Sequence, residues 1–179
     1  MADNASAEVS WSARNRADQE LPAVLDFFTE ADFYFQTALP DQLSEAEIIR
    51  LLGDDTRLLL ADGEPVGLWA LRSAASGHSQ LLFRLRAAAP DSWWAAAYKE
   101  ITDALLWGTE TVRVTVPAFE FDPRLPRILR GIGLTDEGLL GGIVLHRGRR
   151  YGRHYFAQLW AGEPPASEHD QAAQGRGEG

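Results

Sequence analysis

TVRVTVPAFEFDPRLPRILRGIGL, residues 111–134, holds the densest succession of structural signals in the chain. Its first part alternates Val112, Val114 and Val116 with polar residues, and this period of two predicts a strand with one buried face. Pro117 is predicted to end that strand, because proline has no N–H to donate to a neighbouring strand. The stretch therefore opens with a short β-strand.

A short helix follows, and both of its ends carry the residue types that usually stand there. Asp122 and Pro123 fit an N-cap and the first helical position. Apolar residues then recur at helical spacing, at Leu125, Ile128, Leu129 and Ile132. Gly131 and Gly133 are predicted to stop the helix, since glycine most easily adopts the left-handed conformation of a C-terminal cap.

This order of strand, turn, helix and glycine stop resembles the C-terminal half of the GNAT superfamily of acyltransferases. In that family a strand is followed by an Asn-Pro opening, a helix of the form xxIRLYEKLGF and a closing hairpin. The matching run here is DPRLPRILRGIGL, with corresponding positions at Pro123, Arg127, Ile128 and Gly133. Residues 136–160 are similar to the hairpin, and the whole resemblance spans about residues 31–160. Within the family, the chain is most similar to the ribosomal-protein N-terminal acetyltransferases.

The composition predicts one globular domain. The chain has 179 residues, 45% of them hydrophobic, which is enough to bury a core. We expect a mobile N-terminus over residues 1–12, a single domain over 13–161, and a disordered acidic tail over 162–179. No apolar run is long enough to span a membrane, and the N-terminus does not have the pattern of a secretory signal. A net charge of −9 argues against nucleic acid as a partner, and the absence of cysteine is compatible with the cytoplasm.

The rest of the chain alternates helical and strand patterns. Helices are predicted over residues 18–30, from the capping box Ser44–Glu47 onward, and over 92–107. Strands are predicted over residues 56–62 and 65–72, joined by a turn at Asp62-Gly63, and over 80–87. The fold class is therefore α/β, with a mixed sheet of six or seven strands and about four helices. The resemblance adds that two central strands are splayed.

The resemblance places the acyl donor at the turn before the long helix. GNAT enzymes carry R/Q-x-x-G-x-G/A there, and the glycines let backbone N–H groups surround the pyrophosphate of coenzyme A. The nearest register here runs from Arg86 to Asp91 and has no glycine. Pro90 lacks an N–H, and Asp91 has the same sign of charge as the phosphates. The residues that the resemblance assigns to the donor are Leu85, Arg86, Ala87, Ser92, Trp93, Asp122 and Arg127.

The catalytic groups of the family are also altered. Leu129 stands where many members have the tyrosine that protonates the departing thiolate. For a base that deprotonates an amine acceptor, we predict Glu120 first and His154 second, with His146 also weighed. The aromatic residues Phe33, Tyr34 and Phe35 either pack in the core or form a wall of the acceptor pocket. With four histidines and no cysteine, we find no spacing typical of a metal site.

Arginines cluster in two places on this acidic chain. Arg124, Arg127 and Arg130 follow the short helix, and Arg147, Arg149, Arg150 and Arg153 surround the last hairpin turn. They either pair with carboxylates of the chain or meet an anionic partner. The partners considered are the phosphates of coenzyme A and an acidic acyl carrier protein with its phosphopantetheine arm.

Two functions are consistent with these observations. The first is an acyltransferase that moves an acyl group from a pantetheine thioester, either acyl-CoA or an acyl carrier protein, to an amine of a small molecule or peptide. A carrier-fed enzyme of this kind would suit biosynthesis of a small metabolite. The second is a protein that has kept the fold without the chemistry and serves as a binding or scaffold module.

Overall fold

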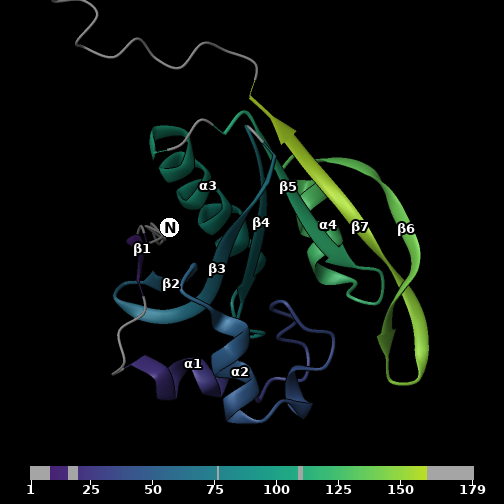
Figure 1. Ribbon diagram of the computed structural model, residues 1–179. Helices are drawn as coiled ribbons and strands as arrows, with labels where there is room; N and C mark the ends of the chain where they lie inside the picture. The colour runs from purple at the N-terminus through teal and green to yellow at the C-terminus, as the bar shows by residue number, and fades with distance from the viewer. Residues whose placement is uncertain (1–8, 16–19, 76, 109–110, 161–179) are drawn as a thin grey trace, which may run out of the picture.

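A computed structural model describes residues 9–15, 20–75, 77–108 and 111–160 of the chain (Figure 1). Helices and strands are interspersed along the sequence, and one short 3-10 helix, η2, precedes α2. They are β1 (Trp11–Asn15), α1 (Leu21–Phe27), η2 (Pro40–Gln42), α2 (Glu45–Leu52), β2 (Thr56–Ala61), β3 (Glu64–Ala75), β4 (His78–Leu85), α3 (Asp91–Gly108), β5 (Arg113–Phe119), α4 (Arg124–Gly131), β6 (Thr135–His146) and β7 (Arg149–Leu159).

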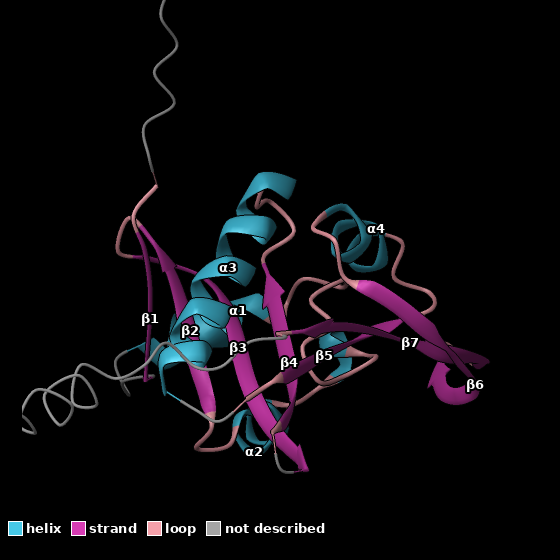
Figure 2. Ribbon diagram, turned by 90° about the horizontal axis from the view of Figure 1, so that it is seen from above, coloured by secondary structure: helices cyan, strands magenta, loops and turns pink. Residues whose placement is uncertain are grey.

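One seven-stranded sheet runs through the molecule in the order β1-β2-β3-β4-β5-β7-β6. All neighbouring strands are antiparallel except β4 and β5, which are parallel. Two apolar cores lie on opposite faces of the sheet: α3 and α4 cover one, and α1 and α2 cover the other. Figure 2 shows α3 and α4 on one side of the strands and α2 on the other. The predicted α/β class, with a mixed sheet and four α-helices in the described part of the chain, is confirmed.

Several local predictions are confirmed because they rest on side-chain and turn chemistry. The capping box is present, since the Ser44 N–H donates to the Glu47 carboxylate at 2.8 Å. Asp62 and Gly63 join β2 to β3 with φ angles of 52° and 84°, the left-handed pair that a two-residue hairpin turn requires. Helix α1 is shorter than predicted, and the aromatic segment that follows it folds back as turns.

The first strand was not predicted. Trp11 and Ser12 fall inside the expected mobile N-terminus, yet they begin β1, which pairs antiparallel with β2. The ring of Trp11 packs edge-on against that of Trp93 at 5.7 Å between centroids, so this strand also covers part of the α3 side. Residues 1–8 and 161–179, which include most of the expected mobile N-terminus and the acidic tail, lie outside the described residues. None of the helices in the described ranges is both long and apolar enough to cross a membrane.

The prediction that Pro117 ends its strand was wrong, because β5 continues through Pro117 to Phe119. The Glu120 N–H donates to Gly152 of β7, whereas the Arg113 N–H donates to Gly77 on the β4 side. Since N–H groups alternate between the two edges of a strand, the nitrogen of Pro117 faces β4 and not β7. Proline is tolerated there because β4 has already moved away.

Strands β4 and β5 are hydrogen-bonded at one end only. Their register joins His78, Ser79 and Gln80 to Arg113, Val114 and Thr115, and no pairing follows beyond these residues. Figure 1 shows the two strands meeting at one end and separating toward the other. The splay of central strands expected from the resemblance is therefore present, and it opens between residues 81–85 and 116–119.

Candidate functional site

A pocket lies where β4 and β5 separate, on the face of the sheet that α1 and α2 cover. Its volume is ≈ 570 Å³ with the open mouth included. It is lined by the connection after α1, by residues of β3, β4, β5 and β7, and by Asp122 and Leu125 at the start of α4. The lining residues are Tyr34, Phe35, Gln36, Arg72, Gln80, Leu82, Phe83, Arg84, Pro117, Ala118, Phe119, Asp122, Leu125 and Arg153.

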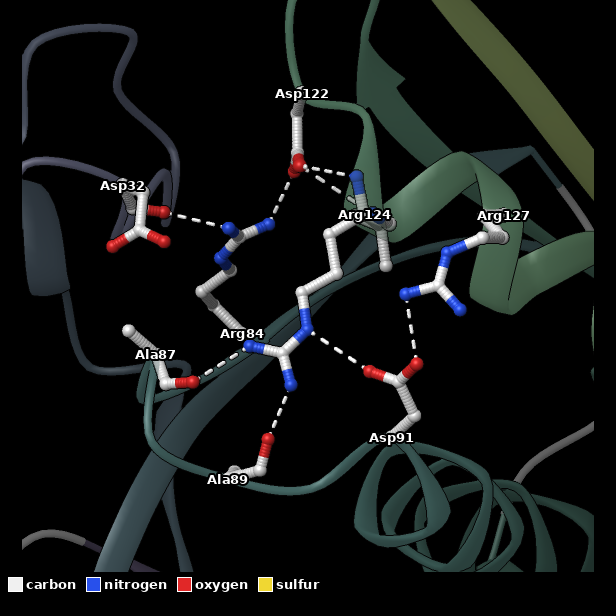
Figure 3. A network of polar contacts seen from close by, with 9 residues as sticks. Asp32, Arg84, Ala87, Ala89, Asp91, Asp122, Arg124 and Arg127 are labelled. Atoms are coloured by element: carbon white, nitrogen blue, oxygen red, sulfur yellow. Dashed lines mark hydrogen bonds and ion pairs between the residues drawn. The ribbon is translucent and has the colours of Figure 1, made fainter.

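A buried ion pair joins the two separated strands. Arg84 on β4 donates to the carboxylate of Asp122, which follows β5, and both side chains are only 3% exposed. The second terminal nitrogen of Arg84 donates to the Asp32 carbonyl at 2.6 Å (Figure 3). The guanidinium also lies between two aromatic rings, 5.2 Å from the centroid of Tyr34 and 5.1 Å from that of Trp94. Arg84 therefore separates the pocket from the α3 side of the gap.

Asp122 also caps the start of helix α4. Its Oδ1 accepts the backbone N–H groups of Arg124 at 3.0 Å and Leu125 at 3.4 Å, so the carboxylate caps α4 as the sequence predicts. One buried carboxylate thus fixes the start of α4 and holds the end of β5 to β4. Burial of an ion pair costs solvation, and these additional hydrogen bonds offset part of that cost.

The turn from β4 to α3 is occupied by the side chain of Arg124. Its Nη1 donates to the Ala87 carbonyl at 2.8 Å, its Nη2 to the Ala89 carbonyl, and its Nε to the Asp91 carboxylate at 3.1 Å (Figure 3). The guanidinium also lies 5.2 Å from the centroid of the Trp94 ring. The carbonyl oxygens of this turn therefore bind Arg124 of α4.

The N–H groups of this turn are largely used within the protein. The Ala87 N–H donates to the Glu30 carboxylate at 2.7 Å, and the Ala89 N–H donates to the Arg86 carbonyl at 3.0 Å. Arg86 itself points to the α1 side, where its Nε binds Glu30 at 2.8 Å, and the hydrogen bond to Glu30 raises the pKa of Arg86. Pro90 has no N–H to offer.

A carboxylate completes this arrangement at the start of α3. Hydrogen bonds from Arg127, at 2.7 Å, and from Arg124 lower the pKa of Asp91, which keeps it ionised. A pyrophosphate would find the Ala87 and Ala89 amides already bonded, and it would have to displace Asp91 from Arg124 and Arg127. The residues of the turn therefore do not fit the pyrophosphate of coenzyme A in the manner that a glycine-rich turn provides.

Comparison with known proteins identifies the architecture. No protein-family model and no curated protein matches this sequence. Among solved structures, the chain is similar to a ribosomal L7/L12 alpha-N-protein acetyltransferase in complex with coenzyme A, with a TM-score of 0.71, 11% identity, and coverage of 86% of this chain and 98% of that one. It is also similar to a GNAT-family acetyltransferase from Bacillus anthracis, with a TM-score of 0.70, 12% identity, and coverage of 85% and 96%.

A third structure agrees with these two. It is an acetyltransferase from Salmonella typhimurium that modifies the N-terminal serine of ribosomal protein L7/L12, with a TM-score of 0.72, 12% identity, and coverage of 85% and 96%. The chain has the GNAT fold. The predicted resemblance is confirmed at the level of architecture, and the likeness covers nearly the whole length of each of these proteins.

Within this GNAT fold, the residues predicted to bind the donor do not form a single open surface. Leu85 is buried in the core under α3 and α4, and Asp122 is paired with Arg84. Trp93 packs on Trp11, whereas Ser92 is exposed at the start of α3. Arg86, Ala87 and Arg127 are the donor-site residues already engaged with Glu30, Arg124 and Asp91.

The residues predicted to act as the base stand outside the pocket. Glu120 is exposed, and its Oε2 accepts the N–H of Gly152, which ties the end of β5 to β7. The ring of His154 lies beside Phe156 of the α3–α4 core, with its Nδ1 3.6 Å from Asp136. These contacts give both side chains a structural task, and their catalytic role stays a prediction.

The aromatic residues predicted to form either core or pocket do both. Phe33 is 1% exposed and packs within the α1–α2 core against Phe27 and Phe28. Phe35 belongs to that core and also lines the pocket, while Tyr34 is half-buried at the pocket wall. Burial raises the pKa of Tyr34, with the nearby Asp122 charge as the next cause, so its hydroxyl keeps its proton.

His146 belongs to a neighbouring aromatic stack. Its ring lies 4.0 Å from that of Phe121 at an interplanar angle of 11°, and its Nδ1 donates to the Ala38 carbonyl at 2.7 Å. Tyr34 contacts the same stack edge-on. The stack connects the β6–β7 hairpin to the segment after α1 and leaves His146 with a structural role there.

The two arginine clusters differ in whether their members have acidic partners. On α4, Arg124 and Arg127 pair with Asp91, and Arg130 pairs with Asp136 at 2.7 Å. At the last hairpin, only Arg147 approaches a carboxylate in the described part of the chain, Asp41 at 3.8 Å. The polar pocket residues that sequence analysis did not single out are Gln36, Arg72, Gln80 and Arg84. The one available signal was the alternation over residues 80–87, which set Leu82, Arg84 and Arg86 on one face.

Proposed function

We propose that this protein is an N-acyltransferase that transfers an acyl group from a pantetheine thioester to an amine. The observation that carries the proposal is the pocket between β4 and β5, which opens at the point where these strands separate in a GNAT fold. Ligands of open α/β sheets bind where strands diverge, because main-chain groups are unpaired there. The acetyltransferases of similar fold, one of them bound to coenzyme A, support the same reaction class.

The reaction needs little from the side chains beyond placement and one proton carrier. The amine nitrogen attacks the thioester carbonyl, a C–N bond forms, the C–S bond breaks, and the sulfur leaves as a thiolate. The amine loses one proton in the process, and the thiolate can take it up. Tyr34 carries the only hydroxyl among the residues that line the pocket, and its raised pKa keeps it protonated. We assign to it the transfer of a proton toward the leaving sulfur.

The source of the thioester is part of the proposal. An acyl carrier protein and acyl-CoA both present a pantetheine thioester, but only coenzyme A brings a pyrophosphate and an adenine. The turn filled by Arg124 favours the carrier, because its Ala87 and Ala89 amides are already bonded and its nearby cations Arg124 and Arg127 are held by Asp91. The acceptor is an amine of a small molecule or peptide.

A second candidate function follows from the ion pair between Arg84 and Asp122. This pair spans the gap between the strands and is almost fully buried, so a pantetheine arm that passes through the gap has to displace it or pass beside it. A protein that no longer transfers acyl groups could keep such a bridge without cost to activity. This candidate is a binding or scaffold protein with a GNAT fold.

Acyl transfer measured with both donors separates these functions. The protein is offered acetyl-CoA or an acetylated acyl carrier protein together with a panel of amino acids and short peptides, and products are detected by mass. We expect acetylated amine with at least one donor, and a rate about a hundredfold lower for Tyr34→Phe. Tyr151→Phe is the matched control, since Tyr151 lies in the adjacent aromatic stack outside the pocket lining. Absence of product with either donor across the panel would favour the scaffold function.

A further inference from the structure

The pocket is positively charged inside an acidic protein. Its lining contains Arg72, Arg84 and Arg153 and a single carboxylate, that of Asp122. Because Asp122 is already neutralised by Arg84, the charges of Arg72 and Arg153 remain uncompensated within the lining. The whole chain has a formal net charge of −9, so this local excess of arginine is opposite in sign to the protein as a whole.

Arg72 is held toward the pocket by a polar neighbour and not by an acid. Its Nη2 donates to the side-chain carbonyl of Gln36, another lining residue. Gln36 has a φ of 59°, in the left-handed region that residues other than glycine seldom adopt. This conformation places the Gln36 side-chain amide where it orients Arg72.

Arg153 is oriented by an aromatic ring. Its guanidinium carbon lies 4.9 Å from the centroid of Phe119, and both residues line the pocket. No carboxylate pairs with Arg153 or Arg72 within the described ranges, whereas every arginine of α4 has an acidic partner. An arginine that is fixed by an uncharged group keeps its bidentate donor face for an anion.

The remaining walls limit the kind of anion that fits. Tyr34, Phe35, Leu82, Pro117 and Phe119 supply apolar and aromatic surface. A phosphate or sulfate ion would leave this surface without a partner, whereas an organic carboxylate with an apolar side chain would cover it. The pocket thus combines two arginine donors for a planar anion with a wall of apolar and aromatic side chains.

We propose that Arg72 and Arg153 bind the carboxylate of the acceptor, which is an amino acid with an apolar side chain. The inference rests on the proposed function in treating this pocket as the place of the acceptor amine. The aromatic walls then hold the side chain of the amino acid, and the two arginines set the direction from which its amine approaches the gap between β4 and β5. A neutral amine would lack this fixed orientation.

Binding of a matched pair of probes tests the inference without any acyl donor. N-acetyl-L-phenylalanine carries the carboxylate, and N-acetyl-L-phenylalaninamide is nearly the same molecule with a neutral carboxamide. By isothermal titration calorimetry we expect the acid to bind at least about tenfold more tightly than the amide, the factor typical of one charge-assisted contact. Arg153→Gln and Arg72→Gln are each expected to weaken the acid about tenfold and to leave the amide unchanged. Arg149→Gln is the control, since Arg149 is exposed at the hairpin and does not line the pocket.

The outcomes are distinct from those of the transfer assay. Failure of the acid to bind, equal affinity for acid and amide, or full affinity in both arginine variants would each overturn the inference. If the acid binds as expected and no donor supports transfer, the carboxylate site stands and the proposed enzymatic function fails. If transfer proceeds equally well to amino acids and to amines without a carboxylate, the enzymatic function stands and the carboxylate site fails.

Discussion

The two sides of the gap between β4 and β5 differ in how their arginines are satisfied. On the α3–α4 side, Arg124 fills the turn before α3 with three hydrogen bonds, and Arg127 closes on Asp91. On the α1–α2 side, Arg72 and Arg153 are held by an amide and an aromatic ring and keep their charge free of carboxylates in the described part of the chain. On the α3–α4 side the arginines are already bound to groups of the protein, whereas on the α1–α2 side two arginines remain available to an anion.

The difference shows that the number of arginines near a site says little about anion binding. An arginine paired with an ionised carboxylate contributes almost no net charge, and its donors are occupied. Arg84 stands between the two sides and contacts both, through the Tyr34 ring and through the Trp94 ring. Substitutions at Arg84, at Gly67 on the neighbouring strand, at Asp91 and at the Arg130–Asp136 pair therefore probe how the two sides are held apart.

The largest expected effect comes from removing one member of the buried pair. Arg84→Met leaves the carboxylate of Asp122 buried without its cation, and a broken buried pair typically costs about 3–5 kcal/mol in the free energy of unfolding. The end of β5 also loses its connection to β4, so the boundary between the two sides of the gap should loosen. Urea unfolding followed by tryptophan fluorescence measures the change.

The double variant Arg84→Met, Asp122→Asn is the control for this prediction. Asparagine keeps an oxygen that can accept the N–H groups at the start of α4, so the cap survives while the unpaired charge is gone. We expect the double variant to recover a large part of the lost stability. A single variant as stable as the natural protein would mean that Asp122 is solvated and that the gap is not bridged in solution.

The next effect is expected at Gly67, which supports the strand that carries Arg84. A Cβ added at Gly67 would lie 2.3 Å from the Arg84 carbonyl and 3.0 Å from the Leu85 Cα, so Gly67→Ala forces β3 and β4 apart. Such overpacking typically costs about 1–3 kcal/mol. Thermal unfolding measures the loss. Gly131→Ala, at the last residue of α4 where an added Cβ meets nothing, is the control and should leave stability unchanged or raise it by up to about 1 kcal/mol.

Most of the fold could be predicted because its signals are local. The glycine stop after α4, the capping box at Ser44 and the hairpin turn at Asp62-Gly63 depend on residues that are close in the chain. The predicted end of β5 at Pro117 failed for a non-local reason. Whether a proline can remain in a strand depends on which neighbour its nitrogen faces, and that neighbour is β4, more than thirty residues earlier.

The candidate site was harder to predict because it is made by distant pairs. Arg84 and Asp122 meet across 38 positions, and Arg72 and Gln36 across 36. The sequence does show that the turn before α3 lacks glycines, but it does not show that Arg124 fills it. Glu120 was predicted because it follows the fifth strand, and its carboxylate binds the Gly152 N–H instead. His154 was predicted from its place on the last hairpin, and alternation along β7 sets it on the face opposite to the pocket residue Arg153.

A smaller effect is expected on the α3–α4 side of the gap. Asp91→Ala releases Arg124 and Arg127 from their shared carboxylate and removes the negative charge that faces the turn. We expect the affinity for coenzyme A to rise about tenfold, as for a gained charge-assisted contact. Isothermal titration calorimetry with coenzyme A measures the two affinities. Pantetheine, which has no phosphate, is the control ligand and should bind both proteins equally; an unchanged affinity for coenzyme A would indicate that the carbonyls and engaged amides of the turn are the dominant obstacle.

The smallest effect is expected at the partly exposed ion pair between Arg130 of α4 and Asp136 of β6. The hydrogen bond from Arg130, helped by the Gly138 N–H and by His154, lowers the pKa of Asp136 in the folded protein. A lowered folded pKa stabilises the protein above the unfolded value of about 4, and this contribution is lost as the pH falls through the folded pKa. Asp136→Asn should therefore lower the free energy of unfolding by less than about 1 kcal/mol at pH 6, and by still less at pH 3. Arg130→Gln removes the other partner and should reproduce the same trend in urea unfolding at the two pH values. A loss of stability that is larger at pH 3 than at pH 6 would contradict this prediction. It would show that Arg130 is held by something other than the charge of Asp136.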